Sequence, residues 1–462
     1  MSKRRALVLV CLALAVPVAA AEPVCRAIAV LPAEVPARNE RLAPWALGWQ
    51  YLLQERLREA PGVVVPRLQQ APRLLDDYLA GRLVPSTPEG RKLVGAALEA
   101  DWLLAPTVGD GPLEWNVRVQ IVDLATGRAQ DLEPATGRDP TVVADAVVEA
   151  VLAAALGEAA PTLEPWAAAE IPPRDVNQLV AQLALWPYTE RADAGKGQLA
   201  TVLAQTANLP TTGSPLWLAY QRFVMTACAA GKAPQALQVV RPWAARQADF
   251  ARAHLLLGIS LTANGRGEEA AAAFGRAAEK SRFALPAVEG QVAALRRLGR
   301  GAEALKALTA AVAAWPAMRP LLLARGQLAL ELGQGQEARA SWAALVRLAP
   351  GVARYRYLEA RALVYADEPA DVVRACQAAL ALDPRAAGDG RQAITELEGD
   401  LRVRANLDSA RLALGLLHEA AGRGAEATRR YREFLRTPAS EPVRALVEER
   451  LARLAGGPVG RG

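Results

Sequence analysis

The sequence is poor in the residue types from which metal sites and disulfide frameworks are built. It has two histidines and four cysteines among 462 residues. Cys11 falls in an apolar N-terminal stretch, which leaves Cys25, Cys228 and Cys376, an odd number at wide and irregular spacing. This spacing matches neither a zinc site nor a disulfide pattern. We therefore expect no metal and no cofactor, and we expect Cys228 and Cys376 to fill space between helices.

Catalytic motifs are equally scarce. The chain has no nucleophile elbow and no phosphate-binding loop. Its adjacent acidic pairs, Asp76–Asp77 and Glu448–Glu449, point to different sides of a helix, so they are poorly placed for paired-carboxylate catalysis. We therefore expect no catalytic residue and a protein that is not an enzyme.

Blocks of one charge are also missing. The formal net charge is +6, and Lys3, Arg4 and Arg5 supply three of these charges at the extreme N-terminus. No run of five or more basic residues occurs elsewhere, so the composition does not favour nucleic acid as a partner.

The first 21 residues have the pattern of an export signal. A basic start is followed by the apolar stretch Ala6–Val16, by Pro17, and by small residues at Ala19–Ala21. The apolar stretch is short for a membrane span, which favours cleavage after Ala21. We expect a periplasmic or otherwise exported protein, and the alternative is an uncleaved signal that tethers the chain to the membrane.

What the chain does contain is a repeat. The pattern Gly-x-Gly-x-Glu-Ala begins at Gly265, Gly299 and Gly333, 34 residues apart, and a further copy begins at Gly422. A period of 34 residues in a helical sequence is typical of a solenoid of paired helices. The glycine between the helices of a pair is expected to adopt positive φ, which costs glycine little.

Numbering each repeat from its first residue places small residues at positions 8 and 20, a large residue at 24 and proline at 32. The predicted repeats begin at Trp217, Ala251, Leu285, Arg319, Ala353 and Asp408. This pattern strongly resembles the tetratricopeptide-repeat family. His254 and His418 fall at positions 4 and 11, which the family normally packs, so we expect both in the core.

The expected organisation of this half is five repeats over 217–386, an interruption over 387–407, a sixth repeat over 408–441, and a capping helix and tail over 442–462. Within the interruption, Gln392–Arg402 is predicted to be helical.

The front of the chain, residues 22–158, alternates short apolar runs with helical stretches. Strands are predicted at 26–32, 63–65, 101–108, 115–122 and 128–132, and helices at 42–58, 68–79, 86–100 and 142–156. Turns are expected at Gly109–Gly111 and at Asp123–Gly127. Residues 159–216 are interpreted as a linker with one irregular helical pair. The predicted fold class is α+β: a small mixed sheet domain followed by an all-α tetratricopeptide-type solenoid.

Four segments of this front region resemble the amino-terminal domain of the TolB family. They are Ile28–Pro32, Pro61–Val65, Leu98–Leu104 and Val119–Gly127. The resemblance implies an envelope-located, non-catalytic domain that contacts other proteins.

Function is expected on the groove formed by the first helix of each repeat, where the family resemblance places the lining at positions 2, 5, 9, 12 and 13. The candidate partner-binding residues are Glu289, Arg296, Arg297, Gln327, Glu331, Arg354, Tyr357, Arg361 and Tyr365. Because arginine grips carboxylates, the hypothesis is a protein or peptide partner with acidic groups or a free carboxylate. Membrane contact is expected only through partners or an uncleaved signal. The leading interpretation is an exported, non-enzymatic adaptor. The alternative is an accessory factor or weak enzyme of cell-wall or polysaccharide metabolism, with a small-molecule site in the front domain.

Overall fold

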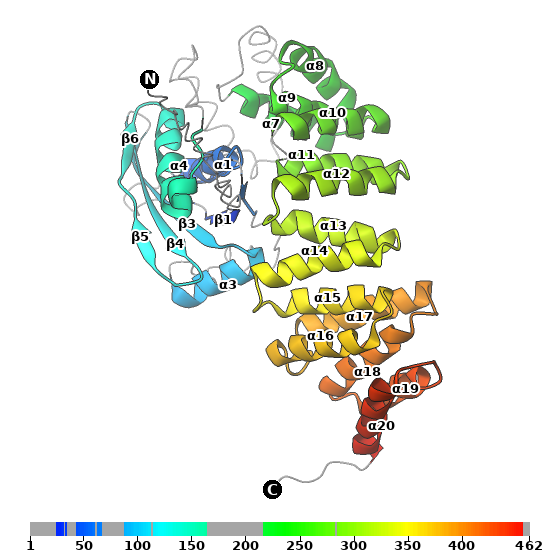
Figure 1. Cartoon of the computed structure of the whole chain (residues 1–462). Coiled ribbons are helices and arrows are strands. Elements are labelled where there is room, and N and C mark those ends of the chain that lie inside the picture. The colour runs from blue at the N-terminus through cyan, green and yellow to red at the C-terminus, as the bar shows by residue number, and fades with distance from the viewer. Residues whose placement is uncertain are drawn as a thin grey trace, which may run out of the picture.

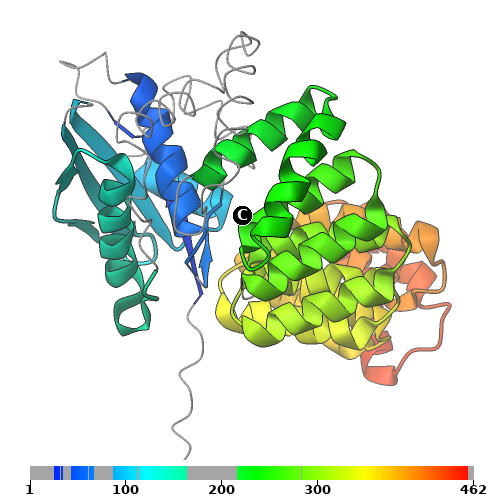
Figure 2. The ribbon, with the colours of Figure 1, turned by 90° about the horizontal axis from the view of Figure 1, so that it is seen from above.

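The computed structural model describes residues 25–31, 33–34, 43–60, 62–66, 87–111, 114–163, 216–281 and 284–455. Within these ranges the chain forms two parts (Figure 1). The first is an N-terminal α/β unit, which we call the front domain, and the second is a stack of paired helices, which we call the solenoid. Seen from above, the front domain lies beside the solenoid (Figure 2). The predicted fold class, a small mixed sheet domain followed by a helical solenoid, is confirmed.

One mixed sheet forms the centre of the front domain. Its strand order is β2-β1-β3-β4-β5, with β6 also paired to β4. The β1 strand is parallel to β2 and β3, whereas β4 is antiparallel to β3, β5 and β6. The strands are β1 (Arg26–Val30), β2 (Val63–Val64), β3 (Trp102–Gly111), β4 (Glu114–Asp123), β5 (Ala129–Asp131) and β6 (Ala135–Gly137).

Helices cover both faces of this sheet. Ile28 and Val30 belong to one buried cluster with side chains of α1 and α4, and Ala29 and Leu31 belong to another with side chains of α3. This division follows from the period of two in β1. The helices are α1 (Ala43–Leu57), α3 (Pro88–Leu98) and α4 (Pro140–Leu156).

Local sequence signals account for most of these boundaries. Thr87 caps α3 by accepting a hydrogen bond from the N–H of Gly90 at 3.1 Å. The predicted turn after β4 is confirmed, because Asp123 accepts from the N–H of Ala125 at 2.8 Å and Gly127 has φ +73°. The helix predicted at 68–79 and the irregular pair predicted within 159–216 lie outside the described residues.

One predicted turn is wrong. Gly109–Gly111 continues β3 instead of turning the chain, since Gly109 pairs with Asn116 and Gly111 pairs with Glu114. The antiparallel partner, β4, begins at Glu114. The alternation of apolar and polar residues from Trp115 predicts β4. This strand pairs with β3 along its whole length, so β3 continues through Gly109 and Gly111.

Over residues 216–281 and 284–455, the described part of the solenoid consists of six helix pairs with two additional helices. The first helices of the pairs, the inner helices, are α7 (Leu216–Ala229), α9 (Ala251–Ala263), α11 (Leu285–Arg297), α13 (Arg319–Glu331), α15 (Ala353–Tyr365) and α18 (Asp408–Ala420). The second, outer helices are α8 (Ala233–Arg246), α10 (Gly267–Lys280), α12 (Gly301–Ala314), α14 (Gly335–Leu348), α16 (Pro369–Leu382) and α19 (Gly424–Phe434). The additional helices are α17 (Asp389–Val403) and α20 (Glu441–Ala455). Five of the inner helices begin at the residue that the repeat numbering takes as position 1.

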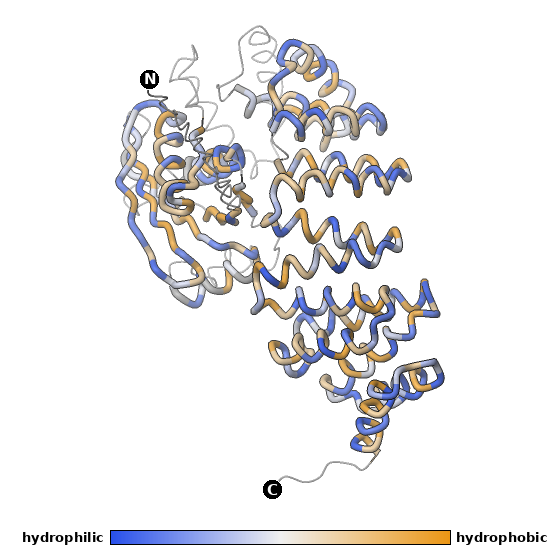
Figure 3. Tube along the Cα trace, viewed as in Figure 1, coloured by the Kyte–Doolittle hydropathy of each residue, from blue (hydrophilic) through white to orange (hydrophobic). Residues whose placement is uncertain are grey.

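Small residues let the helices approach, as the repeat pattern predicts. The ring of Phe274, at position 24, lies between Gly258 of its own repeat and Gly290 of the next. A Cβ atom added at either glycine would lie 2.6 or 2.5 Å from that ring. Each solenoid helix mixes polar and apolar segments (Figure 3).

The two glycines of the Gly-x-Gly motif have different roles. Gly265, Gly299, Gly333 and Gly422 have φ between +71° and +76°, so the first glycine makes the turn as predicted. The second glycine begins the outer helix close to the next repeat. A Cβ atom at Gly301 would lie 2.9 Å from Leu332. This second role was not predicted.

Candidate interaction site between the two domains

The starts of two inner helices contact the front domain through polar groups. The guanidinium group of Arg319 donates to the Asp101 carboxylate at 3.0 Å and to the carbonyl oxygen of Glu99 at 2.8 Å. The hydroxyl group of Tyr355 donates to the Glu99 carboxylate at 2.7 Å. Asp101 also accepts from the backbone N–H of Ala27 at 2.8 Å, which ties this contact to β1.

A second set of contacts joins α1 to the first two repeats. The carboxylate of Glu55 has only 1 % side-chain exposure, and Arg252 lies 3.3 Å from it. Arg252 also donates to the carbonyl oxygen of Glu55 and stacks on Trp217, with 4.3 Å between guanidinium carbon and ring centroid. Gln221 donates to the Tyr51 hydroxyl at 2.9 Å. Glu55 also pairs with Arg58, so this buried carboxylate has two cations beside it, and Arg252 is the one that links it to the solenoid.

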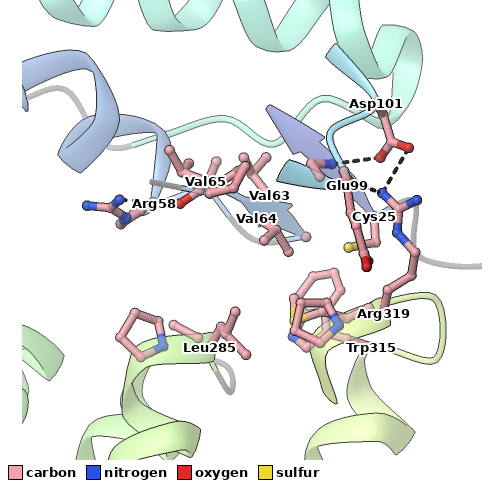
Figure 4. A pocket seen from close by; sticks show the side chains of 18 of the residues that line it. Cys25, Arg58, Val63, Val64, Val65, Glu99, Asp101, Leu285, Trp315 and Arg319 are labelled. Atoms are coloured by element: carbon pink, nitrogen blue, oxygen red, sulfur yellow. Dashed lines mark hydrogen bonds and ion pairs between the residues drawn. The ribbon is translucent and has the colours of Figure 1, made fainter. Parts of the chain in front are cut away.

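Two adjoining cavities, together called the trough, lie between these contacts. Their volumes are about 500 and 570 Å³, and both are lined by Arg58, Glu59 and Pro286. Each volume is in the range of known ligand sites. On the front-domain side of the first cavity lie Val63–Val65, opposite Leu285 and Trp315 of the solenoid (Figure 4).

The solenoid wall of the trough has a regular origin in the sequence. Nine of its residues occupy positions 1, 2 and 5 of three successive repeats, which share one face of each inner helix, and residues that precede these helices, such as Phe250, Trp315 and Met318, also line it. The residues at these positions are Ala251, Arg252, Leu255, Leu285, Pro286, Glu289, Arg319, Pro320 and Leu323. Because the helices begin here, their partial positive ends lie at the trough.

Cys25 lines the first cavity but is not a reactive thiol. It is half-buried and free, and burial, followed by the nearby Asp101 carboxylate, raises its pKa to about 12. The nucleophilic form is therefore scarce at neutral pH.

Five of the nine predicted groove residues lie on α11 and α13. Glu289 is exposed and lines the trough. Arg296 lies 2.7 Å from Glu331, and Gln327 donates to Glu331 at 3.1 Å. Arg297 is exposed beside them. The structure thus brings Arg296, Gln327 and Glu331 together on an open surface.

The other four lie on α15, and their expected exposure is wrong. The side chains of Arg354 and Arg361 are 20 % and 11 % exposed, because both form ion pairs with carboxylates of α17. Tyr357 is 3 % exposed, and its hydroxyl lies 3.4 Å from Asp383. Tyr365 is half-buried under Arg404, 5.2 Å from the guanidinium carbon to the ring centroid. The 387–407 segment therefore covers this part of the inner face.

Sequence reasoning missed most of the trough. It named only Glu289 there, since it treated the inner helices without the front domain. Repeat position alone predicts the solenoid wall. The opposite wall, with Val63–Val65 and Asp101, depends on how two domains dock, and no local signal in the sequence shows this.

The two histidines, Cys228 and Cys376 do not line the trough. His254 and His418 are buried at 6 % and 2 % exposure, as predicted. Cys376 is buried and Cys228 half-buried, and both are free thiols. Among the described residues, no three His, Cys, Asp or Glu side chains are grouped as metal ligands. Within the same ranges, no helix has both the length and the apolar character needed to cross a bilayer.

The 34-residue spacing of the helix pairs defines a helical repeat of the tetratricopeptide type, and three of the pairs set a glycine at position 8 against an aromatic ring at 24. No protein-family model matches the chain, and no curated protein was found to be similar to it. Solved structures with similar folds include MamA (residues 41 to the end) from Desulfovibrio magneticus RS-1, with 20 % identity, a TM-score of 0.29, and coverage of 36 % of this chain and 94 % of that one. YrrB, described as a TPR protein with an unusual peptide-binding site, is 18 % identical with a TM-score of 0.31, over 39 % of this chain and 91 % of its own. A tetratricopeptide repeat protein from Parabacteroides merdae ATCC 43184 is 13 % identical with a TM-score of 0.31, over 52 % of this chain and 98 % of its own.

Proposed function

We propose that this protein is a non-enzymatic interaction scaffold that holds a segment of a partner protein in the trough. The observation that carries the proposal is the trough itself, where three successive repeats present one face to a second wall from the front domain. Successive repeats facing one space suit an extended segment of chain, which can contact each repeat in turn.

The chemistry of the trough supports a partner with mixed character. Leu255, Leu285, Trp315 and Leu323 are only partly buried and offer apolar contact. In the second cavity, the start of α9 and an excess of basic over acidic side chains favour an acidic side chain or a terminal carboxylate on the partner. The basic residues there are Arg56, Arg58, Arg252 and Lys280, and the acidic ones are Glu59 and Asp249. The finer part of the proposal is therefore an acidic peptide segment.

The place of action is part of the proposal. The signal-like first 21 residues and the resemblance of the front region to the amino-terminal domain of the TolB family both support a scaffold of the bacterial cell envelope. N-terminal sequencing of the protein from envelope fractions tests this, with Glu22 expected as the first residue. Recovery of the protein from the cytoplasm with Met1 intact would contradict it.

Crosslinking capture from envelope fractions tests the trough. Leu323→Glu places a charge on the partly buried trough wall and is expected to remove the captured partner. Leu348→Glu is the matched control, because Leu348 is 45 % exposed on the outer helix α14. Both variants should unfold near the wild-type temperature. Equal capture by all three proteins would refute the trough as the binding site.

A second candidate function is small-molecule binding by an accessory factor or weak enzyme of cell-wall or polysaccharide metabolism. The volume of the first cavity, about 500 Å³, favours it. Cell-wall fragments that raise the melting temperature of the wild type but not of Leu323→Glu, with no protein captured, would establish this candidate over the scaffold.

A further inference from the structure

The helix α17 is an insertion that the stack does not require. Between Ala353 and Asp408 the repeat spacing is lengthened, yet α18 packs directly on α15 and α16, as an inner helix does on the preceding pair elsewhere. The added helix instead packs on α15 and α18. It therefore lies on the inner helices, and the solenoid continues past it.

The carboxylates of α17 match arginines of α15. Asp400 accepts two hydrogen bonds from Arg361, each 2.7 Å long, in a paired arrangement of guanidinium and carboxylate. Glu396 lies one helical turn earlier and bridges Arg361, at 3.1 Å, and Arg354. The side chains of Arg361 and Asp400 are 11 % and 9 % exposed, so this contact is largely shielded from water.

The buried apolar side chains of α17 lie on the same face as these carboxylates. Ala393, Ile394 and Leu397 are buried against the solenoid next to the two carboxylates. On the other flank Glu398 lies 3.7 Å from His418 and 3.9 Å from Arg430. Each of the three acidic residues between 396 and 400 thus faces a basic side chain.

We propose that α17 is a built-in occupant of an acidic-helix site on α15, and that a partner helix with carboxylates one turn apart beside an apolar pair competes for it. This inference rests on the proposed scaffold function and names the partner chemistry. An apolar contact of the same volume would stabilise α17 on the solenoid equally well without charges. We therefore interpret Arg354 and Arg361 as a recognition surface for carboxylates.

The geometry also says how such a partner gains over α17. The chain tethers α17 at an effective concentration on the order of millimolar, so an isolated helix competes poorly. The site adjoins the domain junction, because Arg354 precedes Tyr355, which bonds to Glu99. A partner that has one segment bound in the trough would likewise hold its helix near α15 at a high effective concentration.

The test uses the full chain and a fluorescein-labelled synthetic peptide of residues 388–404. The variant Glu396→Gln with Asp400→Asn weakens the built-in helix and is expected to bind the peptide at least tenfold more tightly than wild type does, by fluorescence anisotropy. Adding Arg354→Ala and Arg361→Ala should abolish that binding. The control variant, Glu448→Gln with Glu449→Gln, removes two exposed charges from α20 and should behave as wild type. Failure of the charge-reduced variant to bind the peptide overturns the proposal.

A second measurement needs no variant. A large excess of the peptide added to the wild-type chain should increase hydrogen exchange of the 389–403 amides and leave 408–434 unchanged. No change in 389–403 at saturating peptide also overturns the proposal. If capture of a partner still depends on Leu323 while both peptide experiments fail, the scaffold function stands and only the acidic-helix site is refuted.

Discussion

The carboxylate of Glu99 accepts a hydrogen bond from the hydroxyl group of Tyr355 at 2.7 Å, across 256 positions of sequence. Glu99 ends α3 in the left-handed region, with φ 48° and ψ 37°. A residue with a side chain is strained there by roughly 1–2 kcal/mol, and glycine is not. The position thus bears a strained glutamate whose side chain joins the front domain to the solenoid.

Tyr355→Phe should loosen this junction without unfolding either domain. Burial, and then the Glu99 carboxylate, raise the pKa of Tyr355, so its hydroxyl keeps its proton and donates throughout the neutral range. Loss of a hydrogen bond to a charged group costs about 1.5–3 kcal/mol. Faster hydrogen exchange is expected in 88–111 and at the start of α15. Tyr357→Phe, on the same helix but bonded to Asp383, should leave 88–111 unchanged.

Gly326→Ala should destabilise the solenoid by about 1–3 kcal/mol, because the new methyl group would overlap a buried ring. A Cβ atom at Gly326 would lie 2.2 Å from Nε1 of Trp342, which is 1 % exposed. Gly351→Ala is the control, since nothing lies within 4 Å of its added Cβ and its φ is not positive. Urea unfolding should show the difference. Adding Trp342→Leu to Gly326→Ala should recover part of the loss, and a midpoint unchanged by Gly326→Ala would contradict the packing.

These packing rules explain why the solenoid could be predicted from sequence. Gly258 and Phe274 occupy repeat positions 8 and 24, and similar pairs occupy these positions in other repeats. The contact between them can therefore be predicted from a local sequence pattern. The front-domain strands follow similarly from alternation, although β6 has only three residues, none of them fully buried, and gives no such signal.

The candidate site was less predictable for a physical reason. Arg361 occupies a repeat position that, by the family resemblance, lines the open groove in an uninterrupted solenoid. Its burial is decided by Asp400, 39 residues later in an insertion. Likewise Asp101 meets Arg319 only because the two domains dock, and such long-range pairing leaves no periodic trace in the chain.

Arg361→Glu should detach α17, and Arg296→Glu should not affect it. The first change puts a carboxylate against Asp400 and Glu396, and breaking a buried pair typically costs about 3–5 kcal/mol. Arg296 is 49 % exposed beside Glu331, where an ion pair contributes less than about 1 kcal/mol. Hydrogen exchange at 389–403 is the readout. Equal protection of α17 in both variants would mean that the two carboxylates do not hold it.

His418 should make the last repeats less stable at acidic pH. Burial lowers its pKa, assisted by Arg423 and Arg430 and opposed by Glu398 and Glu426. The imidazole is therefore neutral in the folded chain at pH values where the unfolded chain, with a pKa near 6.5, takes up a proton. Since unfolding then binds a proton, stability contributed by this residue is present above about pH 6.5 and is lost as the pH falls below it.

The comparison that isolates this effect is the wild type against His418→Leu. Urea midpoints measured at pH 7.5 and 5.5 include every other titrating group in both proteins, so the difference between the two pH dependences belongs to His418. The wild type is expected to lose more stability on acidification than the variant. A steeper loss in the variant would mean that protonation of His418 is favoured in the fold, with Glu398, 3.7 Å away, outweighing burial.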